Sequence, residues 1–303
     1  MKSKTVPLLD PTALIQHHFG TWAGWQTTPL NDVFHINRLE THLAHITFPL
    51  APHRKTVYDF IFLTQGQTRR SKGLDAYDIA ENTFFFLPAT QITTHEFVSP
   101  DCTGFFCHFD WELLAKSVVQ PGVGAALPFL HAIGNPVVTI PPAALPNVLH
   151  LLHRLEEEQQ ANRPDVLDMA RVYLLALFFE LKRYADPSAK GRPNAAARIT
   201  QQYKNALMQH IYQKHNVAAY AELLAVSPNH LNKCVKATTG RSAQDTLDDM
   251  VLLEAKALLK QSTLSISEIA FKLGKEDHSN FSRFFKTKTR TTPKEYKLSN
   301  VEK

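Results

Sequence analysis

Side chains that could read a DNA sequence gather at two places in the C-terminal third of the chain. The first group consists of Asn229, Asn232, Lys233 and, about one turn of helix later, Lys236. An asparagine can form two hydrogen bonds with adenine, and a lysine can donate to guanine or to a phosphate. This group therefore has the chemistry of a surface that recognises bases and binds the DNA backbone.

A second group with the same chemistry follows further along the chain. Its members are His278, Ser279, Ser282, Arg283 and Lys286. An arginine can bond to O6 and N7 of guanine or clamp a phosphate, whereas Lys236 and Lys286 are typical of phosphate contacts. Plain surface exposure would explain any single one of these residues equally well. The repetition of the set in register is what favours DNA recognition.

The two groups lie in two copies of one helix-turn-helix pattern, at about residues 216–240 and 265–290. Ala221 matches Ala270 at an offset of 49, whereas Lys236 matches Lys286 at an offset of 50. The additional residue falls in the turn, where insertions are tolerated best. Two helix-turn-helix units on one chain predict two recognition helices for two segments of major groove.

Capping residues and a spacer helix should hold these units in place. Asn216 and Ser265 stand at matching points before the first helix of each unit, where N-caps are expected, and Ser265 opens an S-x-x-E capping box with Glu268. Between the units, residues 243–260 predict a connecting helix of about 27 Å. Grooves one DNA turn apart are separated by about 34 Å, so a rigid helix of this length could serve as the spacer.

Charge is distributed unequally along the 303 residues. Residues 190–303 hold 19 Lys and Arg against 10 Asp and Glu, a net charge of +9, whereas residues 1–189 carry a net charge of −4. A basic C-terminal region suits a phosphate-binding surface, although a merely solvated basic face would have the same composition. The length allows two domains, and a hydrophobic content of 44% fits a soluble globular protein.

Several classes of protein are disfavoured by the sequence. It has no run of 18 apolar residues and no apolar signal core, so neither a membrane span nor secretion is expected. The cysteines, Cys102, Cys107 and Cys234, are odd in number and lack C-x-x-C spacing, which argues against a disulfide framework and a structural zinc site. We expect a cytoplasmic protein without a cofactor.

The N-terminal half has the pattern of an antiparallel β domain. Residues 56–63, 82–87 and 104–109 are rich in β-branched and aromatic residues, and Gly or Pro residues separate them. Many short strands at this spacing favour a small barrel or a sandwich.

Two helices should follow within residues 143–185. The second should begin near Pro164, and from Val172 to Phe179 it is apolar on all sides, so more than one surface should cover it. A second copy of the chain could be one of these surfaces, although burial within a single subunit would also suffice. Residues 186–195, rich in Pro, Gly and Ser, are the predicted linker to a DNA-binding domain at 196–300.

A wider signature runs through the C-terminal region, in residues 254–259, 264–270, 281–286 and 292–296. With these runs, the stretch from about 196 to 298 resembles the DNA-binding domain of the AraC/XylS family of transcriptional regulators. In that family two helix-turn-helix units joined by a long helix bind adjacent major grooves. The resemblance implies that the residues named above match groove-facing positions.

The chain departs from the family pattern at three positions. Lys275 stands where an aromatic residue is usual, Val251 where an arginine is usual, and Arg290 where a glycine is usual. These departures bear on the orientation and strength of the second unit, and they leave the resemblance intact.

The N-terminal region is similar to the cupin-like sensing domains common in this family, through residues 52–55, 56–63, 66, 76–79 and 84–88. The resemblance implies an α+β two-domain protein. Its antiparallel β-barrel, within residues 1–142, would bind a small-molecule effector. Two copies of the chain would form a homodimer through residues 143–185. The expected function is that of a transcriptional regulator, an activator rather than a repressor, whose partners are double-stranded DNA, the effector and RNA polymerase.

An enzymatic alternative rests on the histidines of the strand region. A cupin-type metal enzyme tethered to DNA could use His53, His95 or His108 as metal ligands. No His-x-His pair and no glycine-rich phosphate loop occur, and Cys107 and His108, as neighbours on a strand, should point apart. We therefore predict neither a catalytic site nor a metal site. A protein-interaction module built on residues 143–185 is a third hypothesis.

Overall fold

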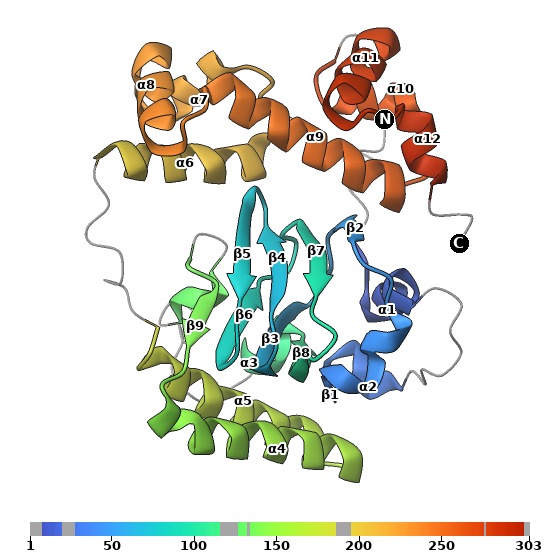
Figure 1. Cartoon of the computed structure of the whole chain (residues 1–303), viewed down its shortest axis with the longest axis vertical. Helices are drawn as coiled ribbons and strands as arrows, with labels where there is room; N and C mark the ends of the chain where they lie inside the picture. The colour runs from blue at the N-terminus through green and yellow to red at the C-terminus, as the bar shows by residue number, and fades with distance from the viewer. Residues whose placement is uncertain are drawn as a thin grey trace. The chain divides into compact units, whose positions relative to one another are not determined.

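A computed structural model describes residues 8–19, 28–115, 127–131, 134–185, 195–275 and 277–299 of the chain. They form two compact units, one made of Leu8–Leu50 and Arg54–Pro187 and the other mainly of Ser188–Lys303 (Figure 1). Most of the predicted linker, at 186–194, lies outside the described residues. Among the helices of the described residues, none combines the length and the apolar character that crossing a membrane requires.

Two separate sheets form the N-terminal unit (Figure 1). The five-stranded sheet has the order β1 (Phe34–Arg38), β8 (Thr103–Phe109), β3 (Tyr58–Gln65), β6 (Thr83–Leu87) and β9 (Val137–Thr139). The four-stranded sheet has the order β2 (Leu50–His53), β7 (Thr93–Val98), β4 (Thr68–Lys72) and β5 (Asp75–Ile79). The predicted antiparallel β domain is confirmed, and its strands form two open sheets and not a closed barrel, because no ladder among the described residues joins the two.

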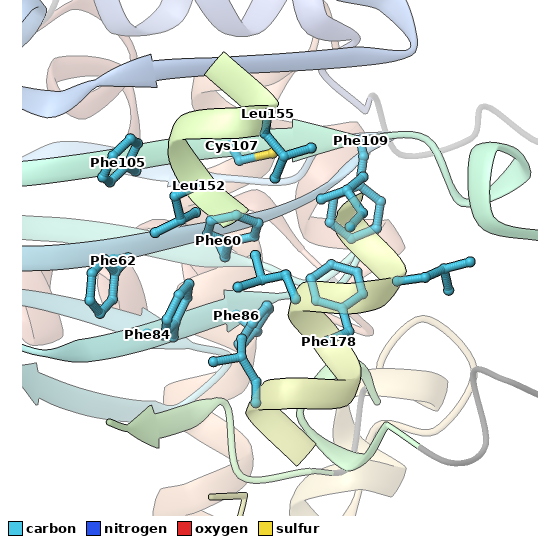
Figure 2. Close-up of a cluster of buried hydrophobic side chains, with 14 of the residues drawn as sticks. Phe60, Phe62, Phe84, Phe86, Phe105, Cys107, Phe109, Leu152, Leu155 and Phe178 are labelled. Atoms are coloured by element: carbon cyan, nitrogen blue, oxygen red, sulfur yellow. The ribbon is translucent and has the colours of Figure 1, made fainter. Parts of the chain in front are cut away.

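Strand alternation divides the five-stranded sheet into two buried faces. One face carries the phenylalanines that Figure 2 shows beneath the helices α4 (Leu145–Ala161) and α5 (Val166–Lys182). The other face contributes Ile61 and Phe85 to a second cluster, in which Ile79 of the four-stranded sheet takes part. A sheet that is covered on both faces requires nearly continuous apolar strands, as β3 and β6 are.

Shorter elements complete this unit around the sheets. They are α1 (Pro11–Phe19), η1 (Pro29–Asp32), α2 (Leu39–His42), η2 (Leu43–His45), α3 (Trp111–Ala115), η4 (Pro128–Leu130) and η5 (Pro142–Ala144). The predicted second helix begins at Val166, two residues after Pro164.

The C-terminal unit is all-helical within its described residues, and its helix-turn-helix units lie at the two ends of α9 (Figure 1). Its helices are α6 (Ala195–His210), α7 (Val217–Leu223), α8 (Pro228–Thr239), α9 (Ala243–Gln261), α10 (Ile266–Lys272), α11 (His278–Thr289) and α12 (Pro293–Leu298). The connecting helix predicted at 243–260 is thus present as α9.

Both predicted N-caps are present. The side chain of Asn216 accepts a hydrogen bond from the Ala219 amide at 2.9 Å. Ser265 accepts from the Glu268 amide at 3.2 Å, and the Glu268 carboxylate accepts in return from the Ser265 amide at 2.8 Å. These bonds satisfy amide groups that the first turn of a helix leaves without a partner.

Two pairs of matching residues adopt the left-handed backbone conformation that the sharp turns require. Ala225 and Gly274 have φ of 53° and 70° between the two helices of each unit, and Gly240 and Arg290 have φ of 73° and 68° after the second helix. A left-handed residue with a side chain costs about 1–2 kcal/mol. The chain therefore carries backbone strain at Ala225 and Arg290.

The glycine positions predict a graded effect on stability. A Cβ at Gly274 would lie 2.1 Å from Cγ of His215, whereas one at Gly240 would have no atom within 4 Å. We expect Gly274→Ala to lower the free energy of unfolding by about 2–4 kcal/mol, and Gly240→Ala by about 1 kcal/mol. Arg290→Gly should raise it by about 0.5–1 kcal/mol. Urea unfolding of the full chain measures all three, and equal effects of the two alanine variants would contradict the packing at His215.

Candidate nucleic-acid interface and N-terminal cavity

The two recognition helices present matching exposed faces. On α8 the face consists of Asn229, Lys233 and Lys236, which follow the i, i+4, i+7 spacing of one helix side and are all exposed. The opposite side of α8 is anchored by Leu231 and Val235, both fully buried. The polar face of α8 therefore points outward because the apolar side fixes the rotation of the helix.

On α11 the same three positions recur fifty residues later. Ser279, Arg283 and Lys286 are exposed, and the helix is anchored by Phe281 and Phe285, both fully buried. Each face thus offers one short polar side chain near the N-terminus of the helix and two longer residues, of which the last is a lysine. Such a face suits entry of the helix into a major groove with its cations near phosphates.

Asn232 makes a contact within the domain that the sequence did not predict. Its amide oxygen accepts a hydrogen bond from the Ala243 amide at 3.0 Å, and the residue is half-buried. Ala243 is the first residue of α9, so this bond ties the recognition helix to the spacer helix. A two-bond contact with adenine would need that same oxygen, so we propose that Asn232 supports the domain instead of reading a base.

Ser282 and His278 complete the predicted set on α11. Ser282 is half-buried at the position equivalent to Asn232, and the residue equivalent to Ala243 is Pro293, which has no amide hydrogen to donate. His278 is the first residue of α11 and is exposed. Both residues remain predicted contacts with DNA.

A largely apolar cavity lies in the N-terminal unit. Side chains of α1, such as Leu14 and Ile15, line it together with Phe48, Ile61 and Phe106. Its polar lining includes Arg70 and the histidines 18, 35, 42, 95 and 108. The sequence predicted an effector site in this domain but did not identify its residues, because strand register decides which side chains point inward.

Two of these histidines are held by one asparagine. The side-chain amide of Asn31 donates to Nδ1 of His35 at 2.8 Å, and Nε2 of His108 donates to the carbonyl oxygen of Asn31 at 2.7 Å. Burial lowers the pKa of His35 to about 3 and that of His108 to about 4, so both rings are neutral at physiological pH. In the cavity, His35 and His108 can therefore act as uncharged hydrogen-bonding groups.

Of the three histidines named in the metal alternative, His53 belongs to a group that could hold a metal ion, because one ring nitrogen each of His17, His18 and His53 lie within 4.8 Å of one another. His95 bonds to the hydroxyl of Thr68 at 2.7 Å, and neither His95 nor His108 belongs to such a group among the described residues. Cys107 packs in the core under α4 and α5, whereas His108 lines the cavity, so the two point apart as predicted. Burial raises the pKa of the Cys107 thiol well above its usual range, which disfavours a thiolate.

Comparison with known proteins identifies the C-terminal fold. A family model described as a helix-turn-helix domain matches residues 220–299. The HTH-type transcriptional regulator GlxA of Rhizobium meliloti (strain 1021) is 34% identical over 117 residues, 36% of this chain and 36% of that protein. The HTH-type transcriptional activator RhaS of Escherichia coli O1:K1 / APEC is 24% identical over 157 residues, 50% of this chain and 54% of that protein.

The similarity is thus partial in extent. The chain spans between about a third and a half of the length of these curated relatives. Among solved structures, ToxT from Vibrio cholerae O395 aligns with 89% of this chain and 99% of its own, at 13% sequence identity and a TM-score of 0.41.

The reassignment of Asn232 predicts a difference between two neighbouring asparagines. Asn232→Ala removes the bond to Ala243, so we expect it to lower the free energy of unfolding by about 1 kcal/mol and to weaken binding to all DNA sequences alike. Asn229→Ala should leave stability unchanged and alter preference at one base pair by about 1–3 kcal/mol. Urea unfolding and gel-shift titration against single-base variants of a selected site measure both effects.

Asn232→Asp is the matched control because it keeps an acceptor for the Ala243 amide, and its stability should stay close to that of the parent protein. A change of base preference in Asn232→Ala, without loss of stability, would restore Asn232 as a base-reading residue.

Proposed function

We propose that the protein is a sequence-specific DNA-binding transcriptional regulator of the AraC/XylS type, because residues 220–299 match a helix-turn-helix family model and the similar proteins are transcriptional regulators. The duplicated exposed face of α8 and α11 carries this proposal. The two faces are joined through α9, whose 19 residues span about 28 Å. This length suits recognition helices that enter major-groove segments about 34 Å apart.

Charge supports contact with the DNA backbone. The net charge of +9 on residues 190–303 is concentrated in the region that holds both recognition helices. Lys236 and Lys286 occupy the same exposed position of the two faces, where each would neutralise a phosphate and release counterions. Asn229, Lys233, Ser279 and Arg283 are the residues proposed to contact bases.

The N-terminal cavity is the proposed effector site. It is concave, mostly apolar and contains a few polar groups, as small-molecule sites are. We assign regulation rather than catalysis because the matching relatives are transcriptional regulators, and activation because RhaS is an activator. The protein would act in the cytoplasm, where DNA and RNA polymerase are available.

Helix α5 is the proposed dimer contact. Most apolar residues of α5 are buried in the core between this helix and the five-stranded sheet. Val172 and Phe179, however, are 57% and 40% exposed, and Ala176 between them is exposed as well. These three residues follow the i, i+4, i+7 spacing, so they form one apolar stripe on the outer side of the helix. A second copy of the stripe would cover it in a two-fold contact.

Substitution in the second recognition helix tests the proposed reading of bases. Arg283→Ala should relax preference at one base pair by about 1–3 kcal/mol, because a guanine contact is lost. Lys286→Ala, the control on the same face, should weaken binding to all sequences alike and reduce the slope of affinity against salt by about 1. Gel-shift titrations on DNA selected in vitro, repeated over a range of salt, distinguish the two effects.

Footprinting provides the broader test of the proposal. Two protected segments, one helical turn apart, are expected on the selected DNA. Protection limited to a single turn, or none, would be incompatible with two recognition helices acting together.

A charge placed in the exposed stripe tests the dimer. Phe179→Lys should shift the protein from dimer to monomer, because the stripe cannot bury an ammonium group without a partner. Light scattering after size-exclusion chromatography measures the mass. Gln202→Lys adds the same charge at an exposed site of α6 and should leave the mass unchanged. A monomeric parent protein at micromolar concentration would contradict this assignment of the stripe.

A further inference from the structure

We propose that the N-terminal cavity recognises a small organic anion, namely a carboxylate with an apolar body, and that Arg70 binds its carboxylate group. This inference rests on the proposed role of the cavity as the effector site and specifies the chemical class of the effector.

Arg70 lies on β4 with its side chain turned inward. It lines the cavity, is only 3% exposed, and its guanidinium lies 5.4 Å from the centroid of the Phe85 ring. Its neighbour Arg69 points the other way and pairs with Asp78 at 2.7 Å on the surface. Strand alternation thus places one arginine in water and the next one between the sheets.

The guanidinium of Arg70 is poorly satisfied by the protein itself. Its Nε is buried and has no hydrogen-bond partner, and the carboxylate of Asp59 lies 3.6 Å from Nη1, beyond a good hydrogen bond. An arginine presents its donors as a planar fork that matches a carboxylate with two parallel bonds. Part of this fork is free to bind such a group inside the cavity.

Arg70 shares its acidic neighbour with a second buried basic side chain. Asp59 is 1% exposed and already forms an ion pair with Lys55, which is fully buried. Asp59 is therefore shared by two basic side chains, and burial, together with the nearby charge of Arg70, lowers the pKa of Lys55 well below its usual range. Burial lowers the pKa of Arg70 to about 10, so its guanidinium remains charged at neutral pH. A buried guanidinium whose hydrogen bonds are incomplete is costly, and an anion that enters the cavity would complete them.

The remaining walls require an apolar ligand body. Leu14, Ile15, Phe48 and Phe106 line the cavity with apolar side chains. Nδ1 of His108 is buried without a hydrogen-bond partner, and as part of a neutral ring that donates through Nε2 it is an acceptor. A hydroxyl on the ligand could donate to it.

Matched pairs of compounds test this inference on the full chain. The linear carboxylates from butanoate to decanoate, and cyclohexanecarboxylate, are compared with their primary amides by thermal unfolding and calorimetric titration. At least one carboxylate should raise the melting temperature, and increasingly so with the logarithm of its concentration once the site is saturated, because it binds only the folded state. Its amide, which has the same shape and no charge, should bind about tenfold more weakly or worse.

Variants at the two neighbouring arginines locate the site. Arg70→Met replaces the buried cation with an apolar chain of similar length and should remove the preference for carboxylate over amide, while Arg69→Met should keep it. Circular dichroism establishes that both variants are folded. If Arg70→Met does not fold, the preference of the unmodified protein for carboxylate over amide remains the deciding measurement.

The outcomes separate this inference from the proposed function. Equal binding of amides and carboxylates, or no stabilisation by any carboxylate at millimolar concentration, would overturn the anion assignment and leave DNA recognition, tested by footprinting, in place. Carboxylate binding that depends on Arg70 but does not change the footprint would uphold the anion site and remove its role as effector site.

Discussion

The rigidity of α9 is the constraint on which the proposed DNA contact depends. One side of this helix is buried along its length, from Leu247 near its start to Leu258 near its end, and each helix-turn-helix unit packs against a different part of it. A flexible connection would let the two recognition helices sample many separations and would spend binding free energy on ordering them. A buried, continuous helix fixes their separation before DNA arrives.

Local patterns explain why the C-terminal unit could be predicted in detail. The caps at Asn216 and Ser265, the spacer helix and the exposed faces of the recognition helices all follow from residues three to seven apart in sequence. Asn232 escaped this reasoning because its partner, the Ala243 amide, lies beyond the turn and becomes a neighbour only when α8 meets α9. A contact that depends on the angle between two helices leaves no mark in local periodicity.

The N-terminal unit was less predictable because its features depend on strand pairing. The strand-rich composition was recognisable, but whether the sheet closes into a barrel is decided by its edge strands, which here end two separate sheets. Register also determines the cavity: Cys107 faces the helices and His108 the opposite side, although the two are adjacent in sequence. The sequence could not identify Arg70 as a buried residue, because Arg69 beside it has the same chemistry. Only the strand pairing of β4 decides which of the two arginines is buried.

Burial of Arg70 has a cost that folding alone does not explain. An apolar residue of similar volume would fill the same space between the sheets, and replacing buried charges in this way is often neutral or stabilising. Asp59 is already paired with Lys55, so it offers Arg70 incomplete compensation. The carboxylate of the proposed effector would bind Arg70 from outside the chain and complete the bonding that Asp59 leaves unfinished.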